Sequence, residues 1–432
     1  MPIDTMPVRE APASVGQRLL WFLDHYRVGD AALNCPILCR IDGPLEIARL
    51  RCAVGGLLVR HEALRTTVER RGRRFWQTVH APPDLELDVI DLMGEPTPDA
   101  AALHRIHDEL HRRIDPAGIP VRVTIWRTGQ LRHFFCLNVH HLATDAWSGS
   151  IQMRDLKILY EREAGDHALF PLPTLQYVDF TLTQEEYFQS ERFEPDLRYW
   201  RERLAEAEFD SIPLAPPAAS RDRNTTAARI SFNAYKTNSL KSLARSCKAT
   251  LFSLMLSLYF TTLHRMTGKG NLAVASVFAN RMRPAIQNTV GFIANLVVLQ
   301  SSARAGASFR SILHSVQVDV REALVHQACP LHLLPAEITV HKGRRADEAV
   351  FQMLPQELNR SRMRDVDITL VAPESIESRF DFEVTALMEQ GELALIVFWN
   401  RERLSQEWVS DFLREFASGA ESIMLNADRC AI

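Results

Sequence analysis

Residues 132–148 read RHFFCLNVHHLATDAWS, and the interpretation of the whole chain starts from this stretch. Its first eight residues form a short, mostly apolar run that is typical of a buried strand. The run leads directly into His140 and His141, so a rigid element would carry both imidazoles at its end. Because successive strand residues point to opposite faces, we expect the two rings to point in different directions.

The histidine pair is followed after three residues by Asp145, and this combination can support acid–base chemistry. An imidazole has an unperturbed pKa of about 6.5 and can accept a proton near neutral pH. A positioned base typically contributes a factor of about 10²–10⁴ to a rate. Asp145 could orient the imidazole, as in a catalytic triad, or could pair with an arginine and brace the loop. The residues alone leave both roles open, and also a purely structural role for the histidines.

The patterns on either side of this stretch mix helices with strands. The elements expected before it are a helix at 15–26, a strand at 34–41, a helix from Pro44, a hairpin of 63–69 and 74–79, a helix at 99–113 and a strand at 121–126. The elements expected after it are strands at 227–233, 271–278, 292–300, 365–371, 380–388 and 392–399, and helices at 236–267, 307–327 and 405–424. Residues 155–225 are rich in proline and indicate a connection between domains. Both halves are therefore predicted to be α+β.

Length and composition set the class of protein. A chain of 432 residues exceeds the roughly 250–300 residues that one core usually serves, so two domains are expected. The formal net charge of −3 gives no overall attraction to nucleic acid or to anionic lipid. The longest apolar stretch, 251–263, is interrupted by serine and threonine and is too short to span a bilayer. The start of the chain does not resemble a signal peptide, and seven scattered cysteines favour reduced thiols in a cytoplasmic protein.

Further short motifs accompany the histidine stretch in a fixed order. They are SVGQRLLWFLDHY (14–26), RHEALRTT (60–67), VHHLATDAWS (139–148), YVDF (177–180), YWRERL (199–204), VGFIAN (290–295), and His326-Gln327 with Pro330-Leu331. Together they resemble the condensation domains of nonribosomal peptide synthesis, which are enzymes of the chloramphenicol acetyltransferase-like superfamily with an HHxxxDG motif. The resemblance covers nearly the whole chain.

The resemblance implies a fold and a division of the chain. The fold is α+β, with two chloramphenicol acetyltransferase-like lobes that form a V-shaped pseudo-dimer around a central tunnel. The N-terminal lobe, 1–175, would carry the HHxxxD motif, and residues 176–432 would form the C-terminal lobe. Carrier proteins would approach the tunnel from opposite mouths with thioesters on phosphopantetheine arms.

The resemblance also implies roles for individual residues. His141 matches the catalytic position, as general base toward the acceptor nucleophile or as the group that positions it and stabilises the tetrahedral intermediate. Asp145 matches an aspartate that points away from the substrate and pairs with an arginine, best matched by Arg281 in Phe278-Ala-Asn-Arg281. Support for the active-site loop would come from His140, Asp145 and Arg281. The substrate tunnel would be lined by Ala146, Trp147, Ser148, Gly291 and Asn295.

Three positions depart from the family pattern. Ala146 replaces the motif glycine, so we expect regular backbone angles there and a methyl group where substrates pass. Asn280 stands where the family usually has glycine before the arginine. The motif expected near 355–366 is degenerate, so no contacts are carried over to that region.

The implied activity is that of a free-standing condensation enzyme. It would transfer a carrier-protein-bound acyl or peptidyl thioester onto an amine or hydroxyl that is free or carrier-bound. The product would be an amide or an ester in nonribosomal peptide or hybrid polyketide biosynthesis, including that of antibiotics. No cofactor would be bound permanently, since the partner acyl or peptidyl carrier protein delivers the phosphopantetheine arm. We expect a cytoplasmic monomer that acts in trans, with no nucleic-acid or membrane partner.

Two other functions and one metal site compete with this interpretation. A coenzyme A-dependent or polyketide-associated O- or N-acyltransferase would use the same histidine chemistry. A catalytically silent recruitment domain would only dock carriers or tailoring enzymes, but such relatives usually lose the motif histidine. His104, His107 and His111 share a helix face at a spacing that could hold zinc, although a solvated helix explains them as well, and no metal is expected.

Overall fold

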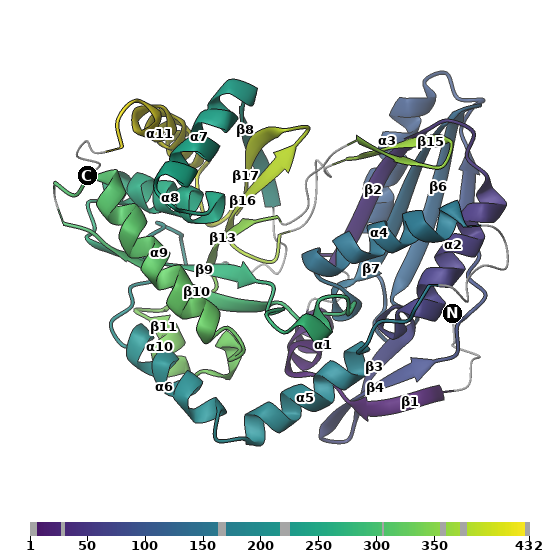
Figure 1. Ribbon diagram of the computed structural model, residues 1–432, viewed down its shortest axis with the longest axis horizontal. Coiled ribbons are helices and arrows are strands. Elements are labelled where there is room, and N and C mark those ends of the chain that lie inside the picture. Colours follow the sequence, from purple (N-terminus) through teal and green to yellow (C-terminus); the bar gives the residue numbers. More distant parts are fainter. Residues whose placement is uncertain are drawn as a thin grey trace. The chain divides into compact units, whose positions relative to one another are not determined.

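The strand expected at 132–139 is β7 (Arg132–His140) of the computed structural model. The structure describes residues 7–26, 31–162, 170–216, 225–304, 306–354, 360–371 and 378–427. Their contacts form two compact units, and Figure 1 shows the chain coloured by residue number. The first unit comprises Met1–Ser190, Arg281–Ile293 and Leu358–Glu377, and the second comprises Glu191–Asn280, Ala294–Glu357 and Ser378–Ile432.

This division differs from the expected boundary between residues 175 and 176. The first unit continues to Ser190, and it also includes two segments from the later part of the chain. One of these segments begins with Arg281, which pairs with Asp145 of the same unit. The other contains a hairpin that joins the sheet of the first unit. Long-range pairing of this kind cannot be located from local composition.

The first unit contains a six-stranded and a three-stranded sheet with five α-helices around them in the described residues. Its helices are α1 (Val15–Tyr26), α2 (Ile47–Arg60), α3 (Pro98–His111), α4 (Ala146–Glu161) and α5 (Tyr177–Gln189), with 3-10 turns η1 (Glu62–Arg65), η2 (His141–Ala143) and η4 (Pro284–Ile286). Its remaining strands are β1 (Pro7–Pro12), β2 (Asn34–Asp42), β3 (Thr66–Arg71), β4 (Arg74–His80), β5 (Asp88–Asp91), β6 (Val121–Gly129), β14 (Arg360–Met363) and β15 (Val366–Leu370). The strand orders are β14-β15-β2-β7-β6-β5 and β1-β4-β3.

Strand β7 lies inside the larger sheet and is buried on both faces. Phe135, Leu137 and Val139 pack with α2 and α4, which Figure 1 shows lying across one face of this sheet. Phe134 and Cys136 pack with α3 on the opposite face. A strand that is covered on both sides reads as a nearly continuous apolar run, and this explains the sequence pattern.

The second unit has one six-stranded sheet, β10-β9-β13-β16-β17-β8, and a small two-stranded sheet, β11-β12, in the described residues. Its strands are β8 (Thr225–Phe232), β9 (Asn271–Phe278), β10 (Asn295–Ser302), β11 (Val340–His341), β12 (Arg344–Arg345), β13 (Ala349–Met353), β16 (Phe382–Glu389) and β17 (Glu392–Asn400). Its helices are α6 (Phe193–Leu204), α7 (Ala234–Ser246), α8 (Leu251–Thr267), α9 (Phe309–Val325), α10 (Ala336–Thr339) and α11 (Gln406–Leu425), with the 3-10 turn η5 (Leu331–Leu333). The core of this unit lies between the sheet and helices that include α8, α9 and α11.

The prediction of a single helix at 236–267 is wrong, since the structure has two helices there, α7 and α8. Lys248 has a positive φ of 51°, which an α-helix cannot accommodate. Thr250 then caps α8, because its hydroxyl accepts the Ser253 N–H at 3.0 Å. The apolar spacing runs across the break and hides it from a periodicity argument.

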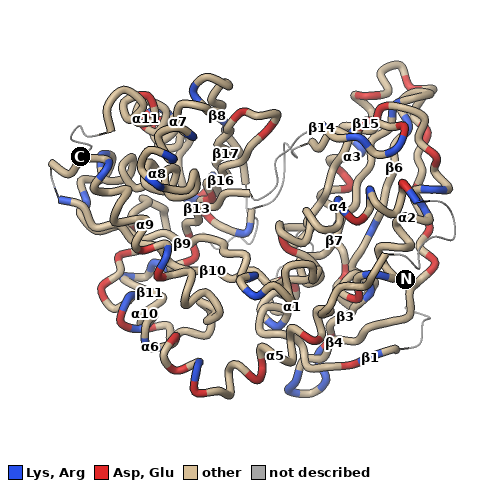
Figure 2. Tube along the Cα trace, viewed as in Figure 1, with Lys and Arg blue, Asp and Glu red and all other residues tan. Residues whose placement is uncertain are grey.

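Acidic and basic residues are interspersed along both units, as Figure 2 shows. This distribution agrees with the small net charge of the sequence. Among the helices in the described ranges, none combines the length and the apolar character that crossing a membrane requires.

Candidate active site

The two motif histidines leave the end of β7 with their backbones held by neighbouring segments. The His140 N–H donates to the Pro120 carbonyl oxygen, and the His141 N–H donates to the Leu33 carbonyl oxygen, both at 2.8 Å. Asn34 of β2 lies opposite His140 in the register of the sheet. Both rings therefore start from a rigid support.

The His141 ring is buried, and a short contact of its Nδ1 atom identifies the tautomer of the neutral ring. Its Nδ1 atom lies 2.6 Å from the carbonyl oxygen of Thr144, and the residue is only 5% exposed. A carbonyl oxygen can only accept, so Nδ1 carries the hydrogen and donates it. In the neutral ring, Nε2 then holds the lone pair and is the nitrogen that can take up a proton. The turn η2 brings the Thr144 carbonyl within reach of the ring.

The His140 ring contacts a different set of groups. Its Nδ1 accepts the N–H of Leu142 at 3.1 Å, so Nε2 carries the hydrogen and faces Asp24 Oδ1 at 3.5 Å. Asp24 also pairs with Arg113. Burial alone would raise the pKa of Asp24, but the hydrogen bonds from His140 and Arg113 lower it. His140 thus links the end of β7 to helix α1, and the two rings have separate surroundings, as expected.

Asp145 stands at the start of α4 and pairs with Arg281. Its Oδ1 accepts the Ser148 N–H at 2.7 Å, both of its oxygens lie 3.1 Å from Arg281 Nη2, and Oδ2 accepts the Ile293 N–H at 3.1 Å. Burial alone would raise the pKa of Asp145, but the charge of Arg281 and the N–H donors lower it. The sequence left open whether Asp145 orients the imidazole or pairs with an arginine to brace the loop. The contacts observed here are those of the second role.

Arg281 begins a loop, and its side chain donates hydrogen bonds to later residues of the same loop. Its Nη1 donates to the carbonyl oxygens of Ile286 and Thr289 at 2.9 and 2.6 Å, and Nη2 donates to Ser148 Oγ at 2.8 Å. The Ser148 hydroxyl in turn donates to the Gly291 carbonyl at 3.0 Å and accepts the Gly291 N–H at 3.1 Å. Only arginine offers this many donors in a fixed plane. These hydrogen bonds therefore hold the loop against the first turn of α4.

Position 291 requires glycine because of its backbone angle and because the Tyr177 ring leaves no space for a side chain. Its φ is +153°, and a Cβ there would lie 2.0 Å from Cδ2 of Tyr177. The Tyr177 hydroxyl donates to the Phe292 carbonyl at 2.8 Å and lies 2.8 Å from Ser14 Oγ. Burial raises the pKa of Tyr177. Gly291 and Ser148 therefore have structural contacts, and their predicted place along a tunnel stays a prediction.

Ala146 and Trp147 open helix α4. Ala146 is the first helical residue and is exposed, so regular helical angles accommodate the residue that replaces the motif glycine. Trp147 is half-buried, and its Nε1–H donates to the Gln287 carbonyl at 3.0 Å. Their predicted contact with substrates stays a prediction.

Asn280 and Asn295 belong to the second unit. Asn280 has a φ of +55°, a left-handed conformation that asparagine tolerates better than most residues, which explains how it can replace glycine. Its N–H donates to Gln327 Oε1 at 3.0 Å. The Asn295 side chain donates to the Gln327 carbonyl at 2.8 Å. The predicted tunnel position of Asn295 stays a prediction.

Sequence reasoning missed three residues that shape this site: Thr144, Tyr177 and Phe292. The Phe292 and His141 ring centroids are 4.8 Å apart, with their planes at 72°. Phe292 directly follows Gly291, so its place in the motif VGFIAN was the available signal. The contact of the Thr144 carbonyl with His141 could not be predicted from the type of residue at 144, because every residue has a backbone carbonyl group.

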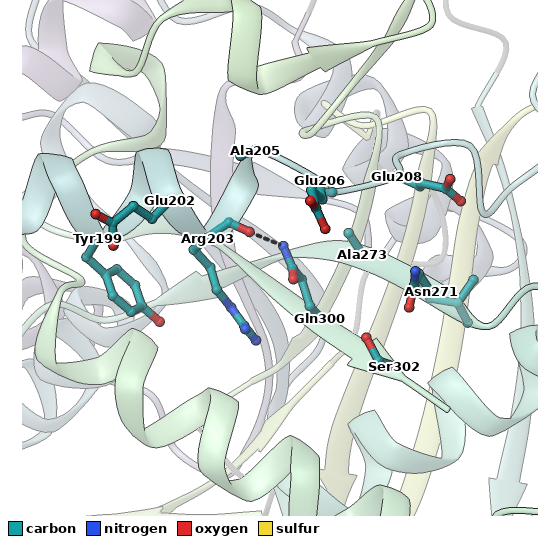
Figure 3. Close-up of a pocket in the computed structure, with 12 residues that line it drawn as sticks. Tyr199, Glu202, Arg203, Ala205, Glu206, Glu208, Asn271, Ala273, Gln300 and Ser302 are labelled. Carbon is teal, nitrogen blue, oxygen red and sulfur yellow. Dashed lines mark hydrogen bonds between the residues drawn. The ribbon is translucent and has the colours of Figure 1, made fainter. Parts of the chain in front are cut away.

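A separate cavity of about 520 Å³ lies in the second unit (Figure 3). Its lining is mostly polar, and Gln300 bridges it by donating to the Arg203 carbonyl at 2.8 Å. The lining residues are Tyr199, Glu202, Arg203, Ala205, Glu206, Ala207, Glu208, Asn271, Leu272, Ala273, Gln300 and Ser302. None of the predicted site residues is among them.

The three histidines of α3 make local contacts. His107 and His111 have ring centroids 4.2 Å apart, and His111 Nδ1 lies 2.8 Å from the His107 carbonyl oxygen. His104 Nε2 lies 4.0 Å from Asp108 Oδ2. Within the part of the chain that the structure describes, no three histidine, cysteine or acidic side chains are grouped to hold a metal ion.

Comparison with known proteins places the chain in a family. A family model described as Condensation domain matches residues 8–429. Chondramide synthase cmdD of Chondromyces crocatus is 32% identical over 334 residues, which cover 76% of this chain and 8% of that protein. Cyclosporin synthetase simA of Tolypocladium inflatum is 27% identical over 411 residues, which cover 93% of this chain and 3% of that protein. This chain thus spans only a small part of the length of the curated relatives that it matches.

Solved structures with low sequence identity share the fold. The SgcC5 protein of Streptomyces globisporus has a TM-score of 0.81 at 22% identity, covering 97% of this chain and 100% of that one. The first condensation domain of the calcium-dependent antibiotic synthetase has a TM-score of 0.83 at 17% identity, with 99% of each chain covered. Condensation domains have the two-lobed α+β fold of chloramphenicol acetyltransferase, as the motifs predicted. Because the family model spans nearly the whole sequence, this chain belongs to the condensation-domain family of nonribosomal peptide synthesis.

Proposed function

We propose that this chain transfers an acyl or peptidyl group directly from a carrier-protein thioester to an amine or hydroxyl. The observation that carries the proposal is the contact between His141 Nδ1 and the Thr144 carbonyl. This contact commits Nε2 to the role of proton acceptor. The surrounding ion pair of Asp145 and Arg281 holds the loop rather than taking part in proton transfer.

The proposed reaction has one tetrahedral intermediate and no covalent enzyme intermediate. The acceptor nitrogen or oxygen attacks the thioester carbonyl while His141 Nε2 takes up its proton. The carbon–sulfur bond then breaks, and the proton passes to the departing phosphopantetheine sulfur. The carrier protein supplies the phosphopantetheine arm in this scheme, and the chain needs no resident cofactor. The central tunnel, the monomeric state and the cytoplasmic location stay predictions.

Reconstitution with an acyl-loaded carrier protein tests the proposal. We expect product, detected by mass spectrometry, with at least one amine or alcohol acceptor. His141→Ala should lower turnover by about 10²–10⁴-fold, the usual contribution of a general base. His264→Ala is the matched control, because His264 is also buried but lies in helix α8 of the second unit. Undiminished turnover by folded His141→Ala protein would refute the proposed role.

Two parallel measurements separate the rival functions. Replacing the loaded carrier with a free coenzyme A thioester identifies a coenzyme A-dependent transferase, if turnover persists without any carrier. Binding of the loaded carrier, measured by calorimetry, without product from any acceptor identifies a recruitment domain. Either result overturns the proposal as stated.

A further inference from the structure

The His141 ring has a second contact besides its hydrogen bond, namely the edge-to-face contact with Phe292. The hydrogen bond to the Thr144 carbonyl fixes the position of Nδ1, and a rotation of the ring about that contact would change the direction of Nε2. An aromatic neighbour at an angle of 72° restricts this rotation, because it fixes the plane of the imidazole. The direction of Nε2 therefore depends on where the Phe292 ring lies.

The backbone of Phe292 is fastened at three adjacent points. The preceding residue, Gly291, exchanges two hydrogen bonds with Ser148. The carbonyl of Phe292 itself accepts the Tyr177 hydroxyl, and the N–H of the residue after it is held by Asp145. The motif aspartate thus supports the residue that packs against the motif histidine.

Helix α1 limits the position of the Phe292 ring from another side. A Cβ at Gly16 would lie 2.7 and 2.8 Å from the ring carbons Cδ1 and Cε1 of Phe292. Real side chains do not approach so closely, so any larger residue at 16 must displace the ring. Gly16 lies within the regular helix α1, and closeness rather than a special backbone angle explains the glycine.

We propose that Phe292 is a positioning residue for the His141 imidazole and that Gly16 provides the space that keeps the Phe292 ring in place. The inference rests on the proposed function, in which Nε2 of His141 takes up the acceptor proton. It extends that function to a chain of contacts from Asp145 through Phe292 to the imidazole.

The first test separates orientation from binding. Phe292→Leu keeps an apolar side chain but removes the aromatic face, and we expect kcat to fall about tenfold with KM unchanged, a change equivalent to about 1.4 kcal/mol. Gly16→Ala should lower kcat by at least as much. Gly55→Ala is the matched control, since Gly55 is another helical glycine of the same unit with open space where its Cβ would lie.

The double variant gives the decisive result. If the added methyl group at position 16 acts through the Phe292 ring, then Gly16→Ala should have little further effect once Phe292→Leu has removed that ring, and the two losses should not add. Additive losses, or a Phe292→Leu variant with unchanged kcat, would overturn the proposal.

A measurement that needs no substrate keeps this inference separate from the proposed function. In protein labelled with ¹⁵N-histidine, the His141 signals are assigned by their loss in His141→Gln. We expect an Nδ1–H ring in the wild type and shifted His141 signals in Phe292→Leu and Gly16→Ala, but not in Gly55→Ala. Unshifted signals contradict the positioning role even if acyl transfer is found. Shifted signals without any acyl transfer refute the proposed function alone.

Discussion

Helix α4 and its cap contain two buried aspartates, Asp145 and Asp155, that differ in what they hold together. Asp145 caps the helix and pairs with Arg281. Asp155 lies in the second half of the helix, where its Oδ2 is 2.7 Å from Arg60 Nε and 2.9 Å from His61 Nε2. Both are carboxylates in a nearly dry environment, and both are neutralised by an arginine from a distant part of the chain.

The difference lies in the partners of these arginines. Arg281 belongs to the loop that carries Phe292 and thereby borders His141. Arg60 ends helix α2, and its guanidinium carbon lies 3.6 Å from the centre of the Phe170 ring. Asp155 therefore fastens two helices of the unit, whereas Asp145 fastens the surroundings of the proposed base. The same charge chemistry should affect activity in one place and stability alone in the other.

The largest effect is expected for Asp145→Asn. It leaves the buried Arg281 without its countercharge, so the free energy of unfolding should fall by about 3–5 kcal/mol. Turnover per folded molecule should also fall about 100-fold, because the loop beside His141 loses its anchor. Denaturant unfolding and the carrier-protein assay measure the two effects. Full turnover in the folded variant would mean that the ion pair does not support the site.

Asp155→Asn is the matched variant in the same helix. It should lower the free energy of unfolding by about 3 kcal/mol, because Arg60 loses its buried partner. Turnover per folded molecule should equal that of the wild type. A loss of turnover as large as that of Asp145→Asn would remove the distinction between the two aspartates.

Gly291→Ala tests the packing of the loop that follows Arg281 against Tyr177 of helix α5. The added methyl would collide with the Tyr177 ring, and the backbone angle would become unfavourable. We expect a loss of about 1–3 kcal/mol in the free energy of unfolding, which is typical of overpacking, together with lower turnover. Melting temperature and kcat provide the readouts. A variant with wild-type values of both would show that the loop can shift without consequence.

The smallest effect is a dependence of stability on pH. Burial alone would raise the pKa of Asp155, but hydrogen bonds from His61, Arg154 and Arg60 lower it to about 2. A lowered pKa in the folded state stabilises the protein fully above the unfolded pKa of about 4, and this contribution is lost as the pH falls toward 2. The difference in unfolding free energy between the wild type and Asp155→Asn should therefore narrow below pH of about 4. A difference that stays constant down to a pH of about 3 would contradict the assigned pKa.

Local patterns predicted most of the elements but few of the contacts. The run at 132–139 predicted β7 within one residue, because a doubly buried strand has a distinctive composition. The break between α7 and α8 was missed, since a left-handed Lys248 leaves no signal in apolar spacing. The pairing of β15 with β2 joins two segments from opposite ends of the chain and was also missed.

The candidate site was predicted through its motif residues, and the resemblance rather than the spacing supplied Arg281 as the partner of Asp145. The contacts that orient His141 were not predicted. One uses a backbone carbonyl, that of Thr144, and the other depends on Phe292, which is placed by the unusual φ of Gly291. Such contacts follow from the path of the backbone, which residue types alone do not specify.

The late hairpin β14–β15 has a consequence for synthesis on the ribosome. Its strand β15 (Val366–Leu370) completes the sheet that contains β7. At about 5–20 residues per second, the roughly 180 residues from Ser190 to the end of this strand take about 10–40 s to translate. Until β15 has been made, β2 is an edge strand of the nascent first unit, and an unpaired edge of this kind is prone to pair with other chains.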